Sequence, residues 1–244
     1  MRARSTIRKR RSRIRSAPAC GTLQVRLLGD PADIRFDERV IVRAPSAAED
    51  AFEVPVEVDA RAIGDVEEIV ISVDYGPIPK ILTFRPNRAE PHFSFRFKID
   101  QATPVRASVR TADGSWHVGG VKIDASGGGC TAPAAAYANA DWEEHLGEVR
   151  GRMWPQSGWL RVIVDHPMDT GLADGIPVFI VENLELRDAS GEVYAELDLF
   201  EPVDEDPAFT FHFRSELLTQ ALDLVGRDNN GNEIEATIPH PLTQ

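Results

Sequence analysis

The sequence lacks most of the features that mark catalytic and metal-binding proteins. Only two of its 244 residues are cysteines, Cys20 and Cys130, and they form no CxxC pair, which excludes a cysteine-rich zinc site. The six histidines show no HExxH spacing, and the GxSxG, Walker A and Rossmann fingerprints are absent. No apolar run approaches the ~18–20 residues that a membrane-spanning helix needs. We therefore expect a protein that is not an enzyme, uses no cofactor or metal, and does not span a membrane.

Charge is unevenly distributed along the chain. Residues 1–16 hold eight of the 27 Lys and Arg residues and no acid, although the formal net charge is −12. The acidic remainder repels the phosphate backbone, so we expect no binding to nucleic acid. An export signal needs an apolar segment of about 7–15 residues after its charges, and none follows here. We expect residues 1–34 to be a disordered tail or a remnant of a targeting segment.

Alternation of apolar and polar residues dominates the rest of the sequence. Phe93, Phe95 and Phe97 alternate with Ser94, Arg96 and Lys98, and similar runs recur at short intervals. This period of two is typical of strands with one buried face and one solvated face. About seven strands fall within residues 35–125. Six more are expected at 159–165, 177–187, 192–199, 208–214, 221–227 and 232–238. The pattern predicts an all-β protein of two immunoglobulin-like antiparallel β-sandwiches, at 35–125 and 157–240.

The alternation stops between the two predicted sandwiches. Residues 126–156 open with a segment rich in Gly and Ala, as a linker does. Trp142, Leu146 and Val149 then share one helical face, which predicts a short helix that ends before Trp154. Asn230-Gly231 near the end of the chain looks superficially like part of a calcium loop, but the glycine and glutamate positions of such a loop do not match, so we expect a hairpin turn.

Cys130 stands out because it follows three glycines, Gly127, Gly128 and Gly129. A structural cysteine usually lies in a packed element, whereas glycines let the backbone move or approach a partner closely. A thiolate in such an arm can attack a sulfane sulfur and hold it as a persulfide or mixed disulfide. We expect Cys130 to be at least partly accessible to solvent and not bonded to Cys20. An incidental cysteine in a loop is the alternative that the residues alone leave open.

Two motifs give the chain a recognisable resemblance. The first sandwich, ending in Gly127-Gly-Gly-Cys130, resembles the SoxY family, whose glycine arm carries sulfur intermediates on a cysteine. The second, with the run His166-Pro-Met-Asp-Thr-Gly171, resembles SoxZ, and the fused order is similar to SoxYZ-like carriers associated with quinoprotein dehydrogenases. In SoxY the cysteine stands near a free C-terminus and glycines follow it. Here 114 residues follow it, beginning with Thr131-Ala-Pro133.

The resemblance implies a non-enzymatic carrier protein in the periplasm. Cys130 would be the attachment site for sulfur-containing intermediates, Gly127, Gly128 and Gly129 its arm, and other proteins its partners: Sox-type enzymes or a quinoprotein dehydrogenase. The run 166–171 has no known chemistry and is expected to be structural. The alternative is a non-covalent accessory or assembly partner of a periplasmic quinoprotein dehydrogenase, in which Cys130 is incidental.

Overall fold

A computed structural model describes residues 27–28 and 34–241 of the 244-residue chain. The first half consists of strands: β1 (Ile34–Phe36), β2 (Ile41–Arg43), β3 (Val54–Asp59), β4 (Val66–Val73), β5 (Lys80–Arg85), β6 (His92–Phe97), β7 (Thr103–Thr111) and β8 (Trp116–Ile123). Two single-turn 3-10 helices follow: η1 (Ala135–Ala138) and η2 (Trp142–Glu144).

The second half is also built from strands. They are β9 (Val149–Trp154), β10 (Trp159–Val164), β11 (Asp169–Thr170), β12 (Val178–Phe179), β13 (Val181–Arg187), β14 (Val193–Leu199), β15 (Ala208–His212), β16 (Leu222–Asp228) and β17 (Glu233–Ile238). Short 3-10 turns lie at η3 (Pro155–Ser157) and η4 (Ser215–Leu217). The predicted strands and the predominance of β-structure are confirmed. No helix among the described residues is long and apolar enough to cross a membrane.

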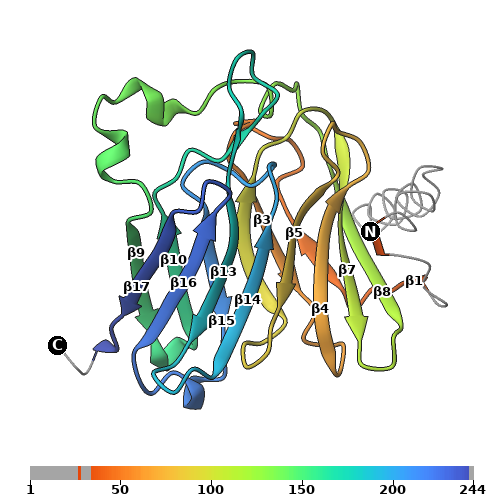
Figure 1. Cartoon of the computed structure of the whole chain (residues 1–244). Coiled ribbons are helices and arrows are strands. Elements are labelled where there is room, and N and C mark those ends of the chain that lie inside the picture. Colours follow the sequence, from red (N-terminus) through yellow and green to blue (C-terminus); the bar gives the residue numbers. More distant parts are fainter. Residues whose placement is uncertain (1–26, 29–33, 242–244) are drawn as a thin grey trace.

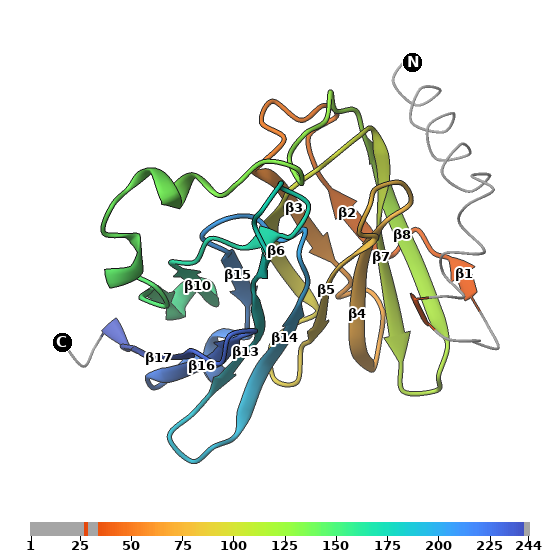
Figure 2. The same cartoon turned by 45° about the horizontal axis from the view of Figure 1, so that its top comes forward.

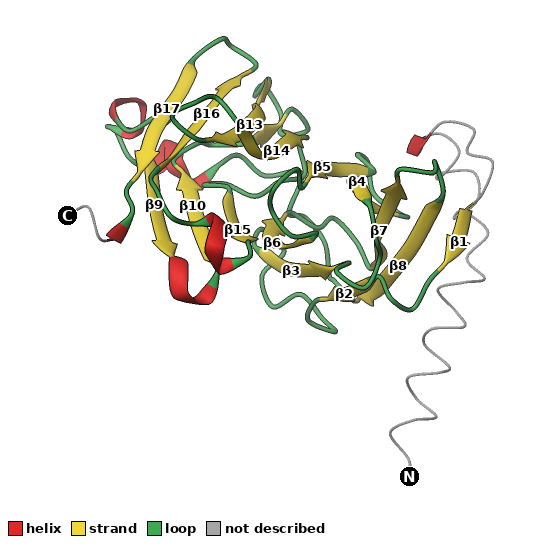
Figure 3. Ribbon diagram, turned by 90° about the horizontal axis from the view of Figure 1, so that it is seen from below, coloured by secondary structure: helices red, strands yellow, loops and turns green. Residues whose placement is uncertain are grey.

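The two halves of the chain share both of the large sheets, which form two layers (Figures 1 and 3). One sheet has nine strands in the order β1-β8-β7-β4-β5-β14-β13-β16-β17, and the other has six in the order β2-β3-β6-β15-β10-β9. The halves join where β5 pairs with β14 and β6 pairs with β15, both antiparallel. The sequence predicts two sandwiches joined by a linker, and it does not reveal that their sheets continue into each other: period-two patterning identifies strands but not which edges pair.

One hydrophobic core runs between the two sheets and through the junction of the halves. Phe84 on β5 lies 4.4 Å from Phe93 on β6 and 5.8 Å from Phe211 on β15, measured between ring centroids. The alternating residues of β6 behave as their sequence indicates, because Phe93, Phe95 and Phe97 are buried there. Pairing in the sheets is antiparallel except between β1 and β8, which are parallel.

The connections between strands gather at two ends of the molecule. The linker, the β11–β12 hairpin and the connection from β2 to β3 lie together at the end drawn uppermost in Figure 1, which turns forward in Figure 2. The linker does not contain the predicted helix over Trp142–Val149: only the 3-10 turns η1 and η2 form, and Val149 begins strand β9. β9 pairs with β10 along its whole length. These backbone hydrogen bonds to a neighbouring strand account for the difference, since local periodicity does not report them.

Candidate functional site

The glycine arm lies against the end of strand β6 and the connection that precedes β3. Gly127 and Gly128 have φ angles of +96° and +97°, a conformation that favours glycine. The N–H of Gly129 donates to the carbonyl oxygen of Ile99 at 3.1 Å. A Cβ atom at Gly129 would lie 2.1 Å from the carbonyl oxygen of Ala51. Glycine at this position therefore lets the arm sit against its neighbours more closely than any other residue would.

Cys130 is buried, with only 3% of its surface exposed. Its thiol donates to the carbonyl oxygen of Lys98 at 3.6 Å and forms no disulfide within the described part of the chain. The prediction of a solvent-accessible thiol is therefore wrong for this conformation, because the arm is held down on both sides. Its predicted separation from Cys20 stays a prediction, since Cys20 lies outside the described residues.

The run His166–Gly171 is hydrogen-bonded to the arm at and after Cys130. The hydroxyl of Thr170 donates to the carbonyl oxygen of Cys130. The carboxylate of Asp169 accepts from the backbone N–H of Ala134 at 3.1 Å and from the hydroxyl of Tyr137. Both hydrogen bonds fix the chain that leaves Cys130. The HPMDTG run and the GGGC arm, which the sequence separates by about forty residues, thus form a single site at one end of the molecule.

Lys98 ties the arm and the HPMDTG run to β6. Its side chain is almost fully buried, and its ammonium donates to the carbonyl oxygen of Met168 at 2.5 Å. Burial lowers the pKa of Lys98, while the nearby carboxylates of Asp169 and Glu205 oppose that shift. The carbonyl oxygen of Lys98 also accepts a hydrogen bond from the thiol of Cys130. Lys98 therefore contacts both the arm and the HPMDTG run.

Two further side chains hold η1 and the HPMDTG run in place. Glu205 accepts hydrogen bonds from the backbone N–H groups of Ala135 and Ala136, which fixes η1. His166 is buried against the ring of Phe179, and its Nδ1 accepts from the backbone N–H of Met168 at 3.0 Å. Burial lowers the pKa of His166 to about 4, although Asp228 acts in the opposite direction. The imidazole is therefore neutral near pH 7 and able to accept that hydrogen bond.

We call the position of residues 127–130 against Ala51, Ile99 and Lys98 the seat of the arm. The chemistry of Cys130 depends on this position. Burial raises the pKa of the thiol to about 11, reinforced by Asp100 and opposed by Lys98. A thiol with this pKa is almost entirely protonated at neutral pH, and the protonated form is a poor nucleophile. In this conformation the thiol is therefore both buried and protonated, and it is a poor nucleophile.

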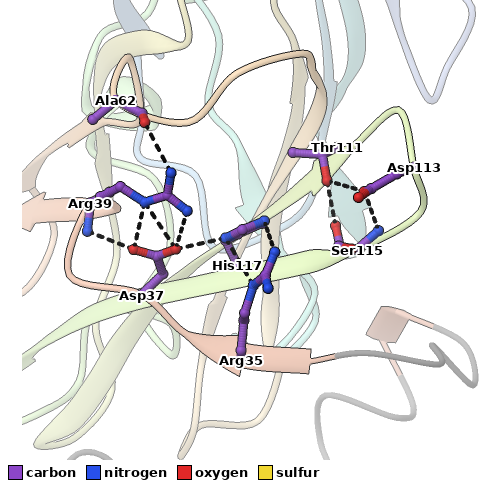
Figure 4. A network of polar contacts seen from close by, with 8 residues as sticks. All are labelled: Arg35, Asp37, Arg39, Ala62, Thr111, Asp113, Ser115 and His117. Carbon is purple, nitrogen blue, oxygen red and sulfur yellow. Dashed lines mark hydrogen bonds and ion pairs between the residues drawn. The ribbon is translucent and has the colours of Figure 1, made fainter.

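Figure 4 shows the other conspicuous polar cluster, which lies around the connections from β1 to β2 and from β7 to β8. There Nδ1 of His117 lies 2.8 Å from the Asp37 carboxylate, which Arg39 also binds at 2.7 Å, while Arg35 contacts the imidazole. Asp37 precedes β2 and His117 is on β8, so the cluster holds the start of the described chain against the nine-stranded sheet. Within residues 27–28 and 34–241, no group of three or more His, Cys, Asp or Glu side chains is arranged to hold a metal ion.

Sequence reasoning found the arm but missed the residues that hold it. Cys130, Gly127, Gly128 and Gly129 do lie together, as their adjacency requires. Lys98 carries no signal, because it alternates with Phe97 as any solvated strand residue would. Thr170 and Asp169 were visible only as members of the HPMDTG run, which was expected to be structural.

Comparison with known proteins finds a family model that matches the first half of the chain. Residues 24–130 match the family described as sulfur oxidation protein SoxY, and the match ends on Cys130. The sulfur carrier protein SoxY from Chlorobium limicola f thiosulfatophilum is a similar solved structure: it is 21% identical, with 46% of this chain and 99% of that chain covered, at a TM-score of 0.39. No curated protein matches the sequence.

A second structural match is weaker. A superoxide reductase (neelaredoxin) from Ignicoccus hospitalis is 15% identical over 39% of this chain and 83% of its own, with a TM-score of 0.30. The family match over residues 24–130 defines the class: this part of the chain is a SoxY-like domain.

Proposed function

We propose that the protein is a carrier of sulfur-containing intermediates, bound covalently to Cys130 and presented to partner enzymes. The observation that carries the proposal is that the SoxY family match ends on Cys130, the single thiol of a glycine arm. The seat described above adds support, because it gives the same thiol a defined protected position. The second half, from residue 157 to 240, would then take the part of a SoxZ-like domain that supplies Thr170 to the seat.

Loading would follow ordinary thiol chemistry once the arm has left its seat. In solvent the pKa of the thiol falls toward its ordinary value of 9.0, so that a thiolate fraction is present. The thiolate attacks the terminal sulfur of a donor persulfide. A new S–S bond to Cys130 forms, the donor's S–S bond breaks, and the donor leaves as a thiolate. Electrons balance without an external oxidant, and return of the arm would shelter the cargo.

The proposed partners and location are taken from the resemblance to SoxY and SoxYZ-like carriers. A carrier needs enzymes that load and unload it, and the Sox-type or quinoprotein dehydrogenase systems of the periplasm are the proposed ones. Because 114 residues follow Cys130, the arm is tied at both ends, and its reach is limited to what residues 126–134 can span. The partner's active site must therefore come close to this end of the molecule.

One observation favours a second function. The buried thiol with its raised pKa is what an incidental cysteine would show. In that case the protein would bind a quinoprotein dehydrogenase as a non-covalent accessory or assembly partner, and Cys130 would only help to pack the arm.

Intact mass spectrometry of protein purified from its own host without reductant separates the two functions. For a carrier we expect persulfide or thiosulfonate adducts that dithiothreitol removes. Cys130→Ser should abolish them, because a hydroxyl is too basic to ionise at neutral pH. The Ser side chain is close in size to Cys, so the variant should fold and bind its partners.

The same variant supplies the contradicting outcome. If Cys130→Ser supports sulfur oxidation or dehydrogenase activity in the host as well as the unmodified chain does, the covalent function is wrong. If it binds its partners normally and the activity is lost, the carrier function stands.

A further inference from the structure

Almost all charged residues in the connections around Cys130 are acidic. We call residues 44–53, 98–102, 124–148, 165–180 and 200–207 the arm end. These segments contain sixteen Asp and Glu residues, and Lys98 is their only Lys or Arg. The ammonium of Lys98 is buried and bound to Met168, so it contributes no positive charge to the surface. Among the described residues, the connections of the arm end therefore present carboxylates to solvent, and none of them carries an exposed Lys or Arg.

The opposite end of the molecule shows that this is a local feature. The connections at 37–40, 60–65, 86–91, 112–115, 155–158, 188–192 and 213–221 hold eight acidic residues and four arginines. At the arm end a few acids pair with cations on strands, as Glu53 does with Arg96 and Asp165 with Arg150. Glu143, Glu144 and Asp174 are exposed and have no cation partner in the described part of the chain.

Exposed apolar side chains collect at the same end. Within the described ranges seven large hydrophobic residues are exposed, and Phe52, Tyr137, Leu172 and Val178 belong to the arm end. Three of these four are linked to the site. Phe52 follows Ala51, against which Gly129 packs. Tyr137 binds Asp169, and Val178 pairs with Thr170, the residue that holds Cys130.

We propose that the arm end is a docking surface for a partner protein whose matching face carries Lys and Arg around an apolar centre. Apolar side chains beside the arm would form the core of the contact, and the surrounding carboxylates would meet the partner's cations. Complementary charge increases the association rate and selects the partner. The inference rests on the proposed function for its purpose, since it brings the partner to Cys130, but the binding itself does not require the thiol.

A second copy of this chain fits the surface poorly. Its arm end would bring a second set of exposed carboxylates, Glu143, Glu144 and Asp174 among them, to the contact, and like charges repel. Residues 1–16 carry eight Lys and Arg and no acid, so binding of the chain's own N-terminal segment is an outcome that the experiment must separate.

The experiment uses a synthetic amphipathic peptide of lysine and leucine as the probe, titrated into the full chain and followed by amide NMR shifts. Shifts should concentrate in the arm end, and raising NaCl from 50 to 500 mM should weaken binding at least tenfold through screening. The double variant Glu143→Lys/Glu144→Lys should weaken binding about tenfold. Its matched control, Glu216→Lys/Glu235→Lys, changes the net charge equally away from the arm end and should alter binding less than twofold.

Apolar contacts are tested in the same way. Leu172→Ser should weaken binding at 500 mM NaCl, whereas Ile41→Ser, at a similarly exposed position outside the arm end, should not. The proposal is overturned if the probe does not bind, if both charge variants weaken it alike, or if salt without the probe shifts the arm-end amides, as release of residues 1–16 would.

Cys130→Ser separates this inference from the carrier function. The variant should bind the probe as tightly as the unmodified chain, because the surface remains. If no adduct is found on Cys130 but binding localises to the arm end, the carrier function fails and the docking surface stands. Adducts on Cys130 together with binding spread over the whole acidic body give the reverse result.

Discussion

At Gly129 the side chain is a hydrogen atom, and the seat of the arm depends on that. A methyl carbon there would have to share space with the carbonyl oxygens of Ala51 and Ile99, at 2.1 and 2.8 Å. Gly128 differs, because a Cβ at Gly128 would meet nothing within 4 Å and only its positive φ favours glycine. Adjacent glycines in one arm thus serve different ends: Gly128 permits the turn and Gly129 permits the close contact.

Gly129→Ala should therefore unseat the arm and expose Cys130. In the seated form the pKa of the thiol is about 11, against a usual 9.0. At pH 8 this lowers the thiolate fraction on the order of a hundredfold. We expect alkylation by iodoacetamide, followed by intact mass, to be slow in the unmodified chain and faster by up to that factor in Gly129→Ala.

Two observations check this prediction. Gly64→Ala adds a methyl group where nothing lies within 4 Å, and it should leave the rate unchanged. Seating requires the protonated thiol, so it weakens as pH rises from about 9 toward 11, and alkylation of the unmodified chain should rise through that range. Equal rates for Gly129→Ala and the unmodified chain would contradict the seated geometry.

Among the elements, the β11–β12 hairpin connects the cysteine to the second half of the chain. His166 stands at its start as a neutral imidazole, and its Nδ1 holds the N–H of Met168. Met168 in turn presents its carbonyl oxygen to Lys98. A proton on Nδ1 would end the first hydrogen bond, because an imidazolium nitrogen cannot accept. The hairpin's hold on the arm is therefore sensitive to acid.

Acid should loosen this hairpin and release the arm. The folded pKa of His166, about 4, lies below the unfolded value near 6.5, so its contribution is complete above pH 6.5 and is lost as pH falls toward 4. At pH 5 the cost is about 2 kcal/mol. The free energy of unfolding, measured by urea denaturation, should fall between pH 7 and pH 5. In His166→Gln this fall should be smaller by about that amount.

His212 offers a matched control for the local effect. Burial also lowers its pKa to about 4, but it lies at the end of β15 away from the arm. His212→Gln should change the pH dependence of unfolding without changing how quickly Cys130 is exposed by acid. If the two variants affect Cys130 alike, the hairpin has no special role.

The elements also show how far the sequence alone could lead. Strands such as β6 and β13 were predictable, since alternation along a strand reflects burial of one face, and the Asn230-Gly231 hairpin was predictable from turn chemistry. Val149–Trp154 was not, because its strand conformation is fixed by pairing with β10. In the candidate site, the adjacency of Cys130 and its glycines is visible in the sequence, but the burial of Cys130 is not, because it depends on Thr170 and Lys98, which only the fold brings to it.

For the whole molecule, the shared sheets make the two halves one structural unit. β5 and β14 exchange backbone hydrogen bonds, as do β6 and β15, and the rings of Phe84, Phe93 and Phe211 pack across the junction. The seat of Cys130 also depends on this junction, because the arm belongs to the first half and Thr170 to the second.

Unfolding should therefore be a single cooperative event. Phe211→Ala removes a fully buried ring at the junction and should cost about 3–5 kcal/mol. β7 and β16 lie on opposite sides of the junction. In hydrogen exchange, the variant should lower the free energy of opening by the same amount for the amides of both strands. Two separate urea transitions, or loss of protection confined to the second half, would show that the halves are independent.

Joining both halves in one polypeptide has a consequence for assembly inside a cell. Alone, the first half would expose β5 and β6 as free strand edges, and the second half would expose β14 and β15. Unpaired edges are templates for aggregation. In one polypeptide, each half is made together with the half whose strands pair with its edges, always in equal amounts. Neither half has to find a separately made subunit, and its edges have less time to associate with the wrong chain.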